Sequence, residues 1–255
     1  LVLLELPIDR PRPALQSYKG SWLSFEIPVA IAQPLKMLGQ SQDCTLFMTL
    51  LAVYKVLLNR YTQQSAICVG TPIANRLEKD VESLIGLFVN TLALRTDIDS
   101  SCRFIDLLKI IREVTLSAYE YQMIPFEKIV EAIQPERSQA HSPLFQTMFT
   151  LQNTQEASLN LDSINLTVEH AEWKTSMFDL TLSLIEMPNG SLAGGFEYAT
   201  DLFDRETISR FINHYIELCK SIVVEPTQRL YELNILTESE KYQLSVAWND
   251  TAADN

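Results

Sequence analysis

The sequence has few of the residues that most often carry chemistry. Its 255 residues include three histidines, four cysteines and seven glycines. It contains no Gly-rich phosphate-binding loop, no GxSxG turn and no HExxH motif, so the patterns that mark nucleotide-binding loops, hydrolase nucleophiles and zinc proteases are missing. The cysteines form no CxxC pair and none lies beside a histidine, which gives no metal-ligand spacing. Residue chemistry alone therefore predicts no particular reaction, and we expect no bound metal.

The sequence is also short of basic residues and of long apolar runs. Lys and Arg number 20 against 32 Asp and Glu, a net charge of -12, whereas nucleic-acid binding needs a basic face. The best apolar stretch, Cys44–Leu58, is interrupted at Thr49 and Lys55 and falls short of the roughly 20 residues that span a membrane. We expect no nucleic-acid partner and no membrane span. A reducing cytoplasm is the simplest compartment for scattered cysteines that behave as small buried hydrophobes.

Hydrophobic periodicity and breaker residues predict strands interleaved with helices. Strands are expected at Ser21–Ile27, Ala66–Gly70, Ile85–Leu94, Leu144–Gln152, Asn165–His170, Phe178–Ile185 and Leu192–Tyr198. Helices are expected at Pro34–Gln40, Ser41–Tyr61, Phe104–Tyr121, Phe126–Ile133 and Arg205–Val224. This alternation predicts a mixed α/β layered fold.

Capping and turn residues mark where these elements begin and end. Asp43 or Thr45 can cap the second helix, and Asp204 the last one, because short polar side chains accept hydrogen bonds from the first helical N–H groups. Pro34 suits the first turn of its helix. The turn at Pro188–Gly190 predicts a hairpin between the last two strands.

Three segments carry a family resemblance. Ile85–Arg95 reads Ile-Gly-Leu-Phe-Val-Asn-Thr-Leu-Ala-Leu-Arg and resembles the fifth core motif of nonribosomal peptide synthetase condensation domains. Tyr121–Glu127 resembles the sixth motif and Arg137–Leu144 the seventh, and the spacing between the three also fits. Leu6–Pro13 is similar to the segment after the fourth motif, and Leu236–Asp254 to the connector into an adenylation domain. The resemblance therefore covers essentially the whole chain.

The resemblance implies a chloramphenicol acetyltransferase-like fold, in which two αβ lobes form a V around a tunnel. Residues 1–229 would be the C-terminal lobe, a mixed sheet flanked by helices, and residues 230–255 the linker toward an adenylation domain. Thr154–Ser176 would contain the latch strand that crosses to the other lobe. The family's His-His-x-x-x-Asp-Gly motif would lie upstream of Leu1, so no catalytic residue is expected within the chain, and the chain alone is expected to be inactive.

The resemblance also implies the reaction and its partners. In the family, an amine on one carrier protein attacks a thioester on another, and a peptide bond forms. The expected partners are the N-terminal lobe of the same domain, the donor and acceptor peptidyl carrier proteins, and the adjacent adenylation domain. No cofactor is expected to bind directly, because the phosphopantetheine arms of the carriers bring the substrates.

The motifs nominate particular site residues. The expected tunnel residues are Asn90, Thr91 and His141; the expected floor-loop residues, within a polar loop at Thr71–Ser83, are Thr71, Pro72, Asn75 and Arg76; the expected structural ion-pair residues are Arg95 and Arg137. Asn90 is the main candidate, because a polar amide on an apolar strand needs partners if it is buried. It either ties neighbouring backbone or faces a polar tunnel, and the family motif favours the tunnel.

Departures from the motifs keep a second function open. Tyr121 and Met123 stand where the family usually has His and Asp, and Ser138 and His141 replace an Asp and an Arg. A neutral imidazole cannot make the bidentate contact that Arg makes. The alternative is a non-catalytic module that recruits a carrier or tailoring protein on the same fold. A third reading is a folding unit with no activity of its own.

The tail carries its own pattern. Thr237 is followed three residues later by Glu240, which predicts a capping box and a short helix. We expect Leu230 to about Trp248 to be ordered against neighbouring elements and the last residues to fray. His214 shares a helix with Phe211 and Leu218 and is expected to be a hydrogen-bonded structural residue.

Overall fold

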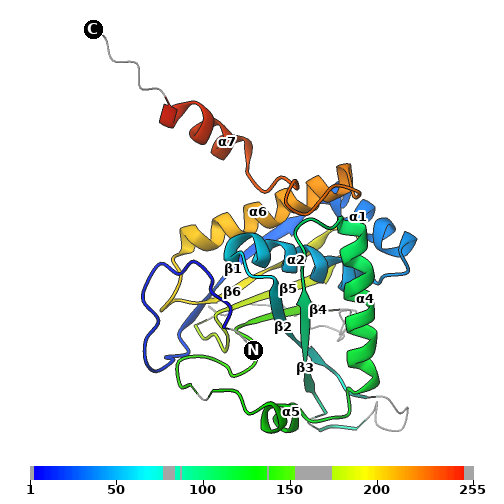
Figure 1. Ribbon diagram of the computed structural model, residues 1–255, viewed down its shortest axis with the longest axis vertical. Helices are drawn as coiled ribbons and strands as arrows, with labels where there is room; N and C mark the ends of the chain where they lie inside the picture. Colours follow the sequence, from blue (N-terminus) through cyan, green and yellow to red (C-terminus); the bar gives the residue numbers. More distant parts are fainter. Residues whose placement is uncertain (1–2, 77–83, 87, 137, 153–173, 250–255) are drawn as a thin grey trace, which may run out of the picture.

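The computed structural model describes residues 3–76, 84–86, 88–136, 138–152 and 174–249. These residues form a six-stranded sheet in the order β1-β6-β5-β4-β2-β3 (Figure 1). Its strands are β1 Gly20–Ile27, β2 Ala66–Ile73, β3 Asn90–Asp97, β4 Thr147–Gln152, β5 Leu180–Glu186 and β6 Leu192–Ala199. Strand β4 is parallel to β2 and β5, and the other neighbouring pairs are antiparallel. The sheet is therefore mixed, as the sequence predicts.

The helices are arranged unequally about the sheet. They are α1 Val29–Ser41, α2 Leu46–Thr62, α4 Phe104–Glu120, α5 Phe126–Ile133, α6 Arg205–Val224 and α7 Glu238–Ser245, followed by a 3-10 turn, Ala247–Asn249. Helices α1, α2, α4 and α6 pack on one another and form one layer over the sheet (Figure 1). Helix α5 lies apart from that layer beside β3, and α7 projects away from the body.

Helix α2 is the centre of the core, with 12 of its 17 residues buried. The prediction that this helix begins at Ser41 was wrong, because the chain turns after α1, with Asp43 in the left-handed region at φ 54°. Thr45 then caps α2 by accepting the Met48 N–H. Among the described residues no single helix is long and apolar enough to cross a membrane, and α1 with α2 meet that test only as a pair bent by 107°.

Several predicted boundaries needed correction. Helix α1 begins at Val29, so Pro34 lies inside it rather than in its first turn. Strand β2 continues to Ile73, so Thr71 and Pro72 are strand residues and not the start of a loop. Strand β3 begins at Asn90 and not at Ile85, because Asn90 pairs with Ile73, the last residue of β2. Residues before Asn90 have no strand partner in the described part of the chain.

Other predictions were confirmed. Helices α4 and α5 and the strands β5 and β6 match the predicted segments within a few residues. The hairpin between β5 and β6 turns at Gly190, whose φ of +86° suits glycine. All four cysteines are free; Cys44 and Cys219 are buried, and Cys68 and Cys102 are partly so. The predicted strand at residues 165–170 lies outside the described residues, and so does the expected latch segment Thr154–Ser176 except for residues 174–176.

The start of α6 shows how the N-terminal segment is held. Asp204 is the N-cap residue, but its carboxylate makes no capping hydrogen bond and pairs with Arg10 instead. Asp9 accepts hydrogen bonds from the Asp204 N–H at 2.8 Å and from the Thr207 hydroxyl at 2.9 Å. A side chain from the proline-rich segment is thus hydrogen-bonded to the start of α6 and holds that segment against the lobe.

Candidate functional site

Asn90 stands at the first position of β3. Its Nδ2 donates to the carbonyl oxygens of Gln122 and Ile124, both at 2.8 Å. Its Oδ1 accepts from the Phe126 N–H at 3.1 Å. Of the two roles that the sequence left open, the structure shows the tie to neighbouring backbone, and contact with a substrate stays a prediction.

The end of β2 lies next to Asn90 and leads into the expected floor loop. Thr71 is buried, and Pro72 pairs with Thr91 across the two strands. Asn75 takes a left-handed conformation with φ 52° as the chain leaves the strand. The sheet therefore brings Thr71, Pro72 and Thr91 to the same end as Asn90, while residues 77–83 lie outside the described part.

Arg76 follows this turn. Its guanidinium lies 4.4 Å from the centre of the Phe88 ring, a cation–π distance, and its Nη1 donates to the Leu84 carbonyl at 2.8 Å. These contacts join the two described ends of the segment that connects β2 to β3. The sequence named Arg76 as a floor-loop residue but gave no sign of its aromatic partner.

His141 is separate from this cluster. It lies in the segment before β4, where its Nδ1 is 3.0 Å from the Ser142 carbonyl oxygen. No hydrogen bond links it to Asn90 or Thr91 within the described part of the chain. Its predicted place in the tunnel therefore stays a prediction.

Of the two expected ion-pair residues, Arg95 forms an ion pair at the surface. Arg95 does pair with Asp97 at 2.7 Å, but both side chains are about half exposed or more, and such surface pairs contribute little. Arg137 lies outside the described residues. The better protected pair is Arg12 with Asp179, whose side chains are 18% and 3% exposed, joined by both carboxylate oxygens. The sequence signal for it was a carboxylate at the start of an apolar strand, which needs a partner when buried.

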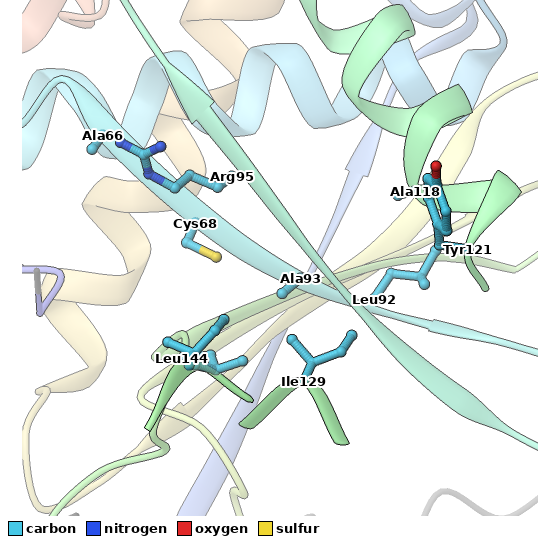
Figure 2. A pocket seen from close by; sticks show the side chains of 10 residues that line it. Ala66, Cys68, Leu92, Ala93, Arg95, Ala118, Tyr121, Ile129 and Leu144 are labelled. Atoms are coloured by element: carbon cyan, nitrogen blue, oxygen red, sulfur yellow. The ribbon is translucent and has the colours of Figure 1, made fainter. Parts of the chain in front are cut away.

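A hollow of about 520 Å³ lies between α5, the end of α4 and the strands β2 and β3. Figure 2 shows its walls, with Leu144 and Ile129 facing the two strands. Small side chains create the space, because Ala66, Ala93 and Ala118 stand where larger residues would fill it. Arg95 is the charged residue of the lining. The volume falls within the range of small-molecule pockets. The sequence patterns did not predict this hollow.

Cys68 lines the same hollow, with Lys55 buried behind it. Burial raises the pKa of the Cys68 thiol, although the charges of Lys55 and Arg95 oppose this. Burial lowers the pKa of Lys55 to about 7, and its Nζ donates to the Leu94 carbonyl at 2.7 Å and to the Thr96 hydroxyl at 2.6 Å. A neutral thiol is a poor nucleophile, so we assign Cys68 to the wall of the hollow and not to a reaction. Among the described residues no three His, Cys, Asp or Glu gather as metal ligands.

Side chains of α2 and α6 bind the tail to the lobe. Arg60 donates to the carbonyls of Leu230, Tyr231 and Leu233, each at 3.1 Å. His214 meets the Tyr61 hydroxyl at 2.7 Å and a Glu240 carboxylate oxygen at 3.0 Å, so its predicted structural role is confirmed.

The capping box of α7 is also confirmed, but the packing expected beyond it is not. Thr237 and Glu240 exchange both hydrogen bonds of the box. Burial raises the pKa of Glu240, but hydrogen bonds from Thr237 and His214 outweigh this and lower it. Leu230 and Leu233 are buried in the core, whereas the apolar residues of the helix and its following turn are exposed: Tyr242, Leu244, Val246 and Trp248. The expected packing along the whole of 230–248 therefore holds for its first part only.

Comparisons with known proteins agree with this architecture. The sheet and its helices match solved structures of the chloramphenicol acetyltransferase-like class, which confirms the predicted fold. The chain superposes with a TM-score of 0.84 on a four-domain nonribosomal peptide synthetase bound to AMP and glycine, at 26% identity over 94% of this chain and 19% of that one. It superposes equally well, at 0.84, on the X-domain from teicoplanin biosynthesis, at 23% identity over 92% of this chain and 54% of the other.

The family follows from the sequence match. The Condensation domain family model matches residues 2–245, so the chain belongs to the condensation domain family, as the motifs predicted. One polypeptide of the linear gramicidin synthase of Brevibacillus parabrevis is 43% identical over 98% of this chain and 5% of its own length. A second polypeptide of the same synthase is 46% identical over 98% of this chain and 3% of its own length. Malpinin synthetase of Mortierella alpina is 41% identical over 98% of this chain and 3% of its own length. The chain thus spans a small part of these relatives.

Proposed function

We propose that the chain is the C-terminal lobe of a condensation domain that forms peptide bonds in a nonribosomal peptide synthetase. The observation that carries this proposal is the match of about nine-tenths of the chain to about half of separate domains of this fold. The superposition on the teicoplanin X-domain includes 92% of this chain and 54% of the X-domain. The superposition on the condensation domain from the MokA polyketide synthase includes 90% of this chain and 55% of the other. One lobe of a two-lobed domain has this relation to the whole.

The reaction would join two carrier-bound substrates. The acceptor amine attacks the carbonyl carbon of the donor thioester, the C–N bond forms as the C–S bond breaks, and the phosphopantetheine thiol leaves with a proton. The His-His-x-x-x-Asp-Gly motif of the N-terminal lobe would orient or deprotonate the amine. This chain would supply the opposite wall, where Asn90, Thr91 and the floor loop meet. Holding both substrates together supplies much of the rate advantage.

The boundaries and partners are part of the proposal. Residues 1–229 were expected to form the lobe, and the burial of Leu230 and Leu233 supports moving its packed end to about Leu236. The remaining tail would lead to the adenylation domain, with the exposed apolar side of α7 against it. The N-terminal lobe and two carrier proteins complete the set of partners, in the cytoplasm.

The test compares the intact condensation domain, supplied with loaded donor and acceptor carriers, with this fragment in the same assay. We expect peptide product from the intact domain, and none above background from the fragment, although the fragment folds. Product from the fragment would show that the missing motif is dispensable. A folded intact domain that binds both carriers but makes no product would overturn the catalytic proposal.

A second candidate is a recruitment module without catalysis. Two observations favour it: the changed residues at Tyr121, Met123, Ser138 and His141, and the likeness to an X-domain solved in complex with OxyB, which is 23% identical and shows the fold alone. Replacing the histidines of the upstream motif separates the two candidates. Catalysis predicts that this change abolishes product, and recruitment predicts unchanged capture of the partner protein with no product before or after it.

A further inference from the structure

Three segments meet at one residue. Asn90 begins β3, pairs with Ile73 at the end of β2, and binds the turn that precedes α5. The turn belongs to the sixth motif, and Asn90 to the fifth. One amide therefore connects the two motifs and stands where the expected floor loop begins.

The amide is chemically suited to this place. It offers two N–H donors and one carbonyl oxygen, and the backbone around it presents two carbonyls, of Gln122 and Ile124, and one N–H, of Phe126. Aspartate at the same position would keep the acceptor, lose both donors and place a negative charge against two carbonyl oxygens. Alanine would lose all three bonds. The two substitutions therefore test different parts of one arrangement.

Helix α5 depends on this connection. It has eight residues, none of them buried, and isolated helices of this length are marginal in water. Its first residue, Phe126, also rests against the Phe145 ring with the centroids 5.6 Å apart. The amide and this ring contact therefore fix the start of the helix. They set where Ile129 and Ile133 stand over the hollow that Figure 2 shows.

We propose that Asn90 is a positioning residue for the condensation reaction. It holds the turn 121–125 and α5 in place, keeps the wall of the hollow against β2 and β3, and does not itself contact a substrate. This inference rests on the proposed function for its catalytic part. The connection between Asn90 and α5 can be tested without that part.

The experiment uses the intact condensation domain within its synthetase module, with loaded donor and acceptor carriers. The variants are Asn90→Ala and Asn90→Asp, and the matched control is Asn59→Ala. Asn59 is a buried amide that also joins separate segments, whereas Asn90 is half-buried; Asn59 donates to the Gln64 carbonyl at 2.9 Å and accepts from the Ser100 hydroxyl at 3.1 Å. Three quantities are measured: amide hydrogen exchange of residues 122–134, the thermal midpoint, and kcat and KM for each carrier-bound substrate.

The positioning role predicts an ordered set of results. In Asn90→Ala, exchange in 122–134 accelerates about tenfold or more, as expected when several hydrogen bonds are lost together, and kcat/KM falls. In Asn90→Asp both effects are at least as large. In Asn59→Ala the thermal midpoint falls, while exchange in 122–134 and kcat/KM stay near those of the wild type.

Direct contact with a substrate predicts a different set. A carboxylate would bind a cationic amine at least as well as an amide does, so Asn90→Asp would keep more activity than Asn90→Ala. That result, or lost activity in Asn90→Ala with unchanged exchange, overturns the positioning role. If the wild-type domain forms no product, the proposed function fails. The exchange data then still decide whether Asn90 holds α5, so the two failures are distinguishable.

Discussion

Helices α2 and α5 lie beside the same two strands and are held in opposite ways. Helix α2 is buried over most of its length, with 12 buried residues among its 17. Helix α5 has an apolar side but no buried residue, and a hollow separates it from β2 and β3. The first is held by packing over its whole length. The second is held at one end by hydrogen bonds to Asn90 and by one ring contact.

The residues that stabilise the sheet and the residues of the proposed site therefore lie in different regions of the chain. Close-packed interiors tolerate little change in volume, whereas segments with few buried contacts open at low free-energy cost. The segments that resemble the fifth and sixth family motifs meet at the loosely held side, around Asn90 and the turn before α5. Binding and catalytic residues are often carried by such segments on a rigid scaffold. In this chain α2 is the scaffold, and α5 belongs to the proposed site.

The largest difference is expected when an aliphatic side chain is shortened to alanine in each of the two helices. Leu57→Ala in α2, at a fully buried position, should lower the free energy of unfolding by about 2–5 kcal/mol. Ile129→Ala in α5, at a half-buried position, should cost about 1 kcal/mol or less, because less apolar area is lost. Urea unfolding of the full chain measures both. Equal losses would show that α5 is as much part of the core as α2.

Lys55 lets the packed region be probed by pH. Its pKa is about 7 in the folded chain against an ordinary 10.5, so between these values the unfolded chain binds a proton that the folded chain lacks. The free energy of unfolding therefore rises with pH across this window, by at most about 1.4 kcal/mol per pH unit, and the contribution is lost as pH falls through 7.

Comparison with Lys55→Met isolates this contribution. Between pH 7 and 10 the free energy of unfolding of the wild type should rise by about 2–4 kcal/mol relative to that of the variant. The thiol of Cys68, whose raised pKa acts in the opposite direction, is present in both proteins and largely subtracts. Denaturant unfolding at several pH values provides the measurement. Parallel pH profiles for the two proteins would mean that Lys55 remains charged in the core.

The sequence predicted the scaffold better than the site, for physical reasons. Helix α4 follows from a 3.6-residue period that local sequence contains. The start of β3 does not, because it depends on where β2 ends: Ile73 is the last partner that Asn90 has. Lys55 appears in the sequence only as an interruption of an apolar run. Its acceptors, Leu94 and Thr96, lie on another element, and the sequence did not identify them.

Asn90 shows the same limit within the site. Its sequence context indicated an amide that needs partners, which the structure confirms. Those partners lie 32, 34 and 36 residues further along the chain, and only the folded arrangement brings them to it. The hollow is a similar case. Alanines at 66, 93 and 118 are unremarkable in separate elements, and they form a space only where those elements meet.

Adding volume should sharpen the comparison. Ala52→Leu in α2, at a fully buried position, should destabilise the chain by about 1–3 kcal/mol, because the core has no room for three more carbons. Ala93→Leu, beside the hollow, should be neutral or stabilise by up to about 1 kcal/mol. The thermal midpoint and urea unfolding distinguish the two. Equal destabilisation would show that the hollow closes in solution.

The smallest effect is expected in the tail, which combines both kinds of attachment. Leu230 and Leu233 are packed in the core, whereas α7 is attached to it through Glu240 and His214. Thr237→Ala removes the capping box and should cost α7 about 1 kcal/mol locally.

Hydrogen exchange on the full chain tests this prediction. Exchange should accelerate in residues 238–246 and stay unchanged in 230–236, and the free energy of global unfolding should move by less than about 0.5 kcal/mol. A control change, Gln243→Ala, lies at an exposed position of the same helix outside the box and should leave exchange in both segments near that of the wild type. Faster exchange throughout 230–246 in Thr237→Ala would mean that the helix and the packed segment open as one unit. Because Arg60 holds three carbonyls of the packed segment independently of α7, we expect the two to open separately.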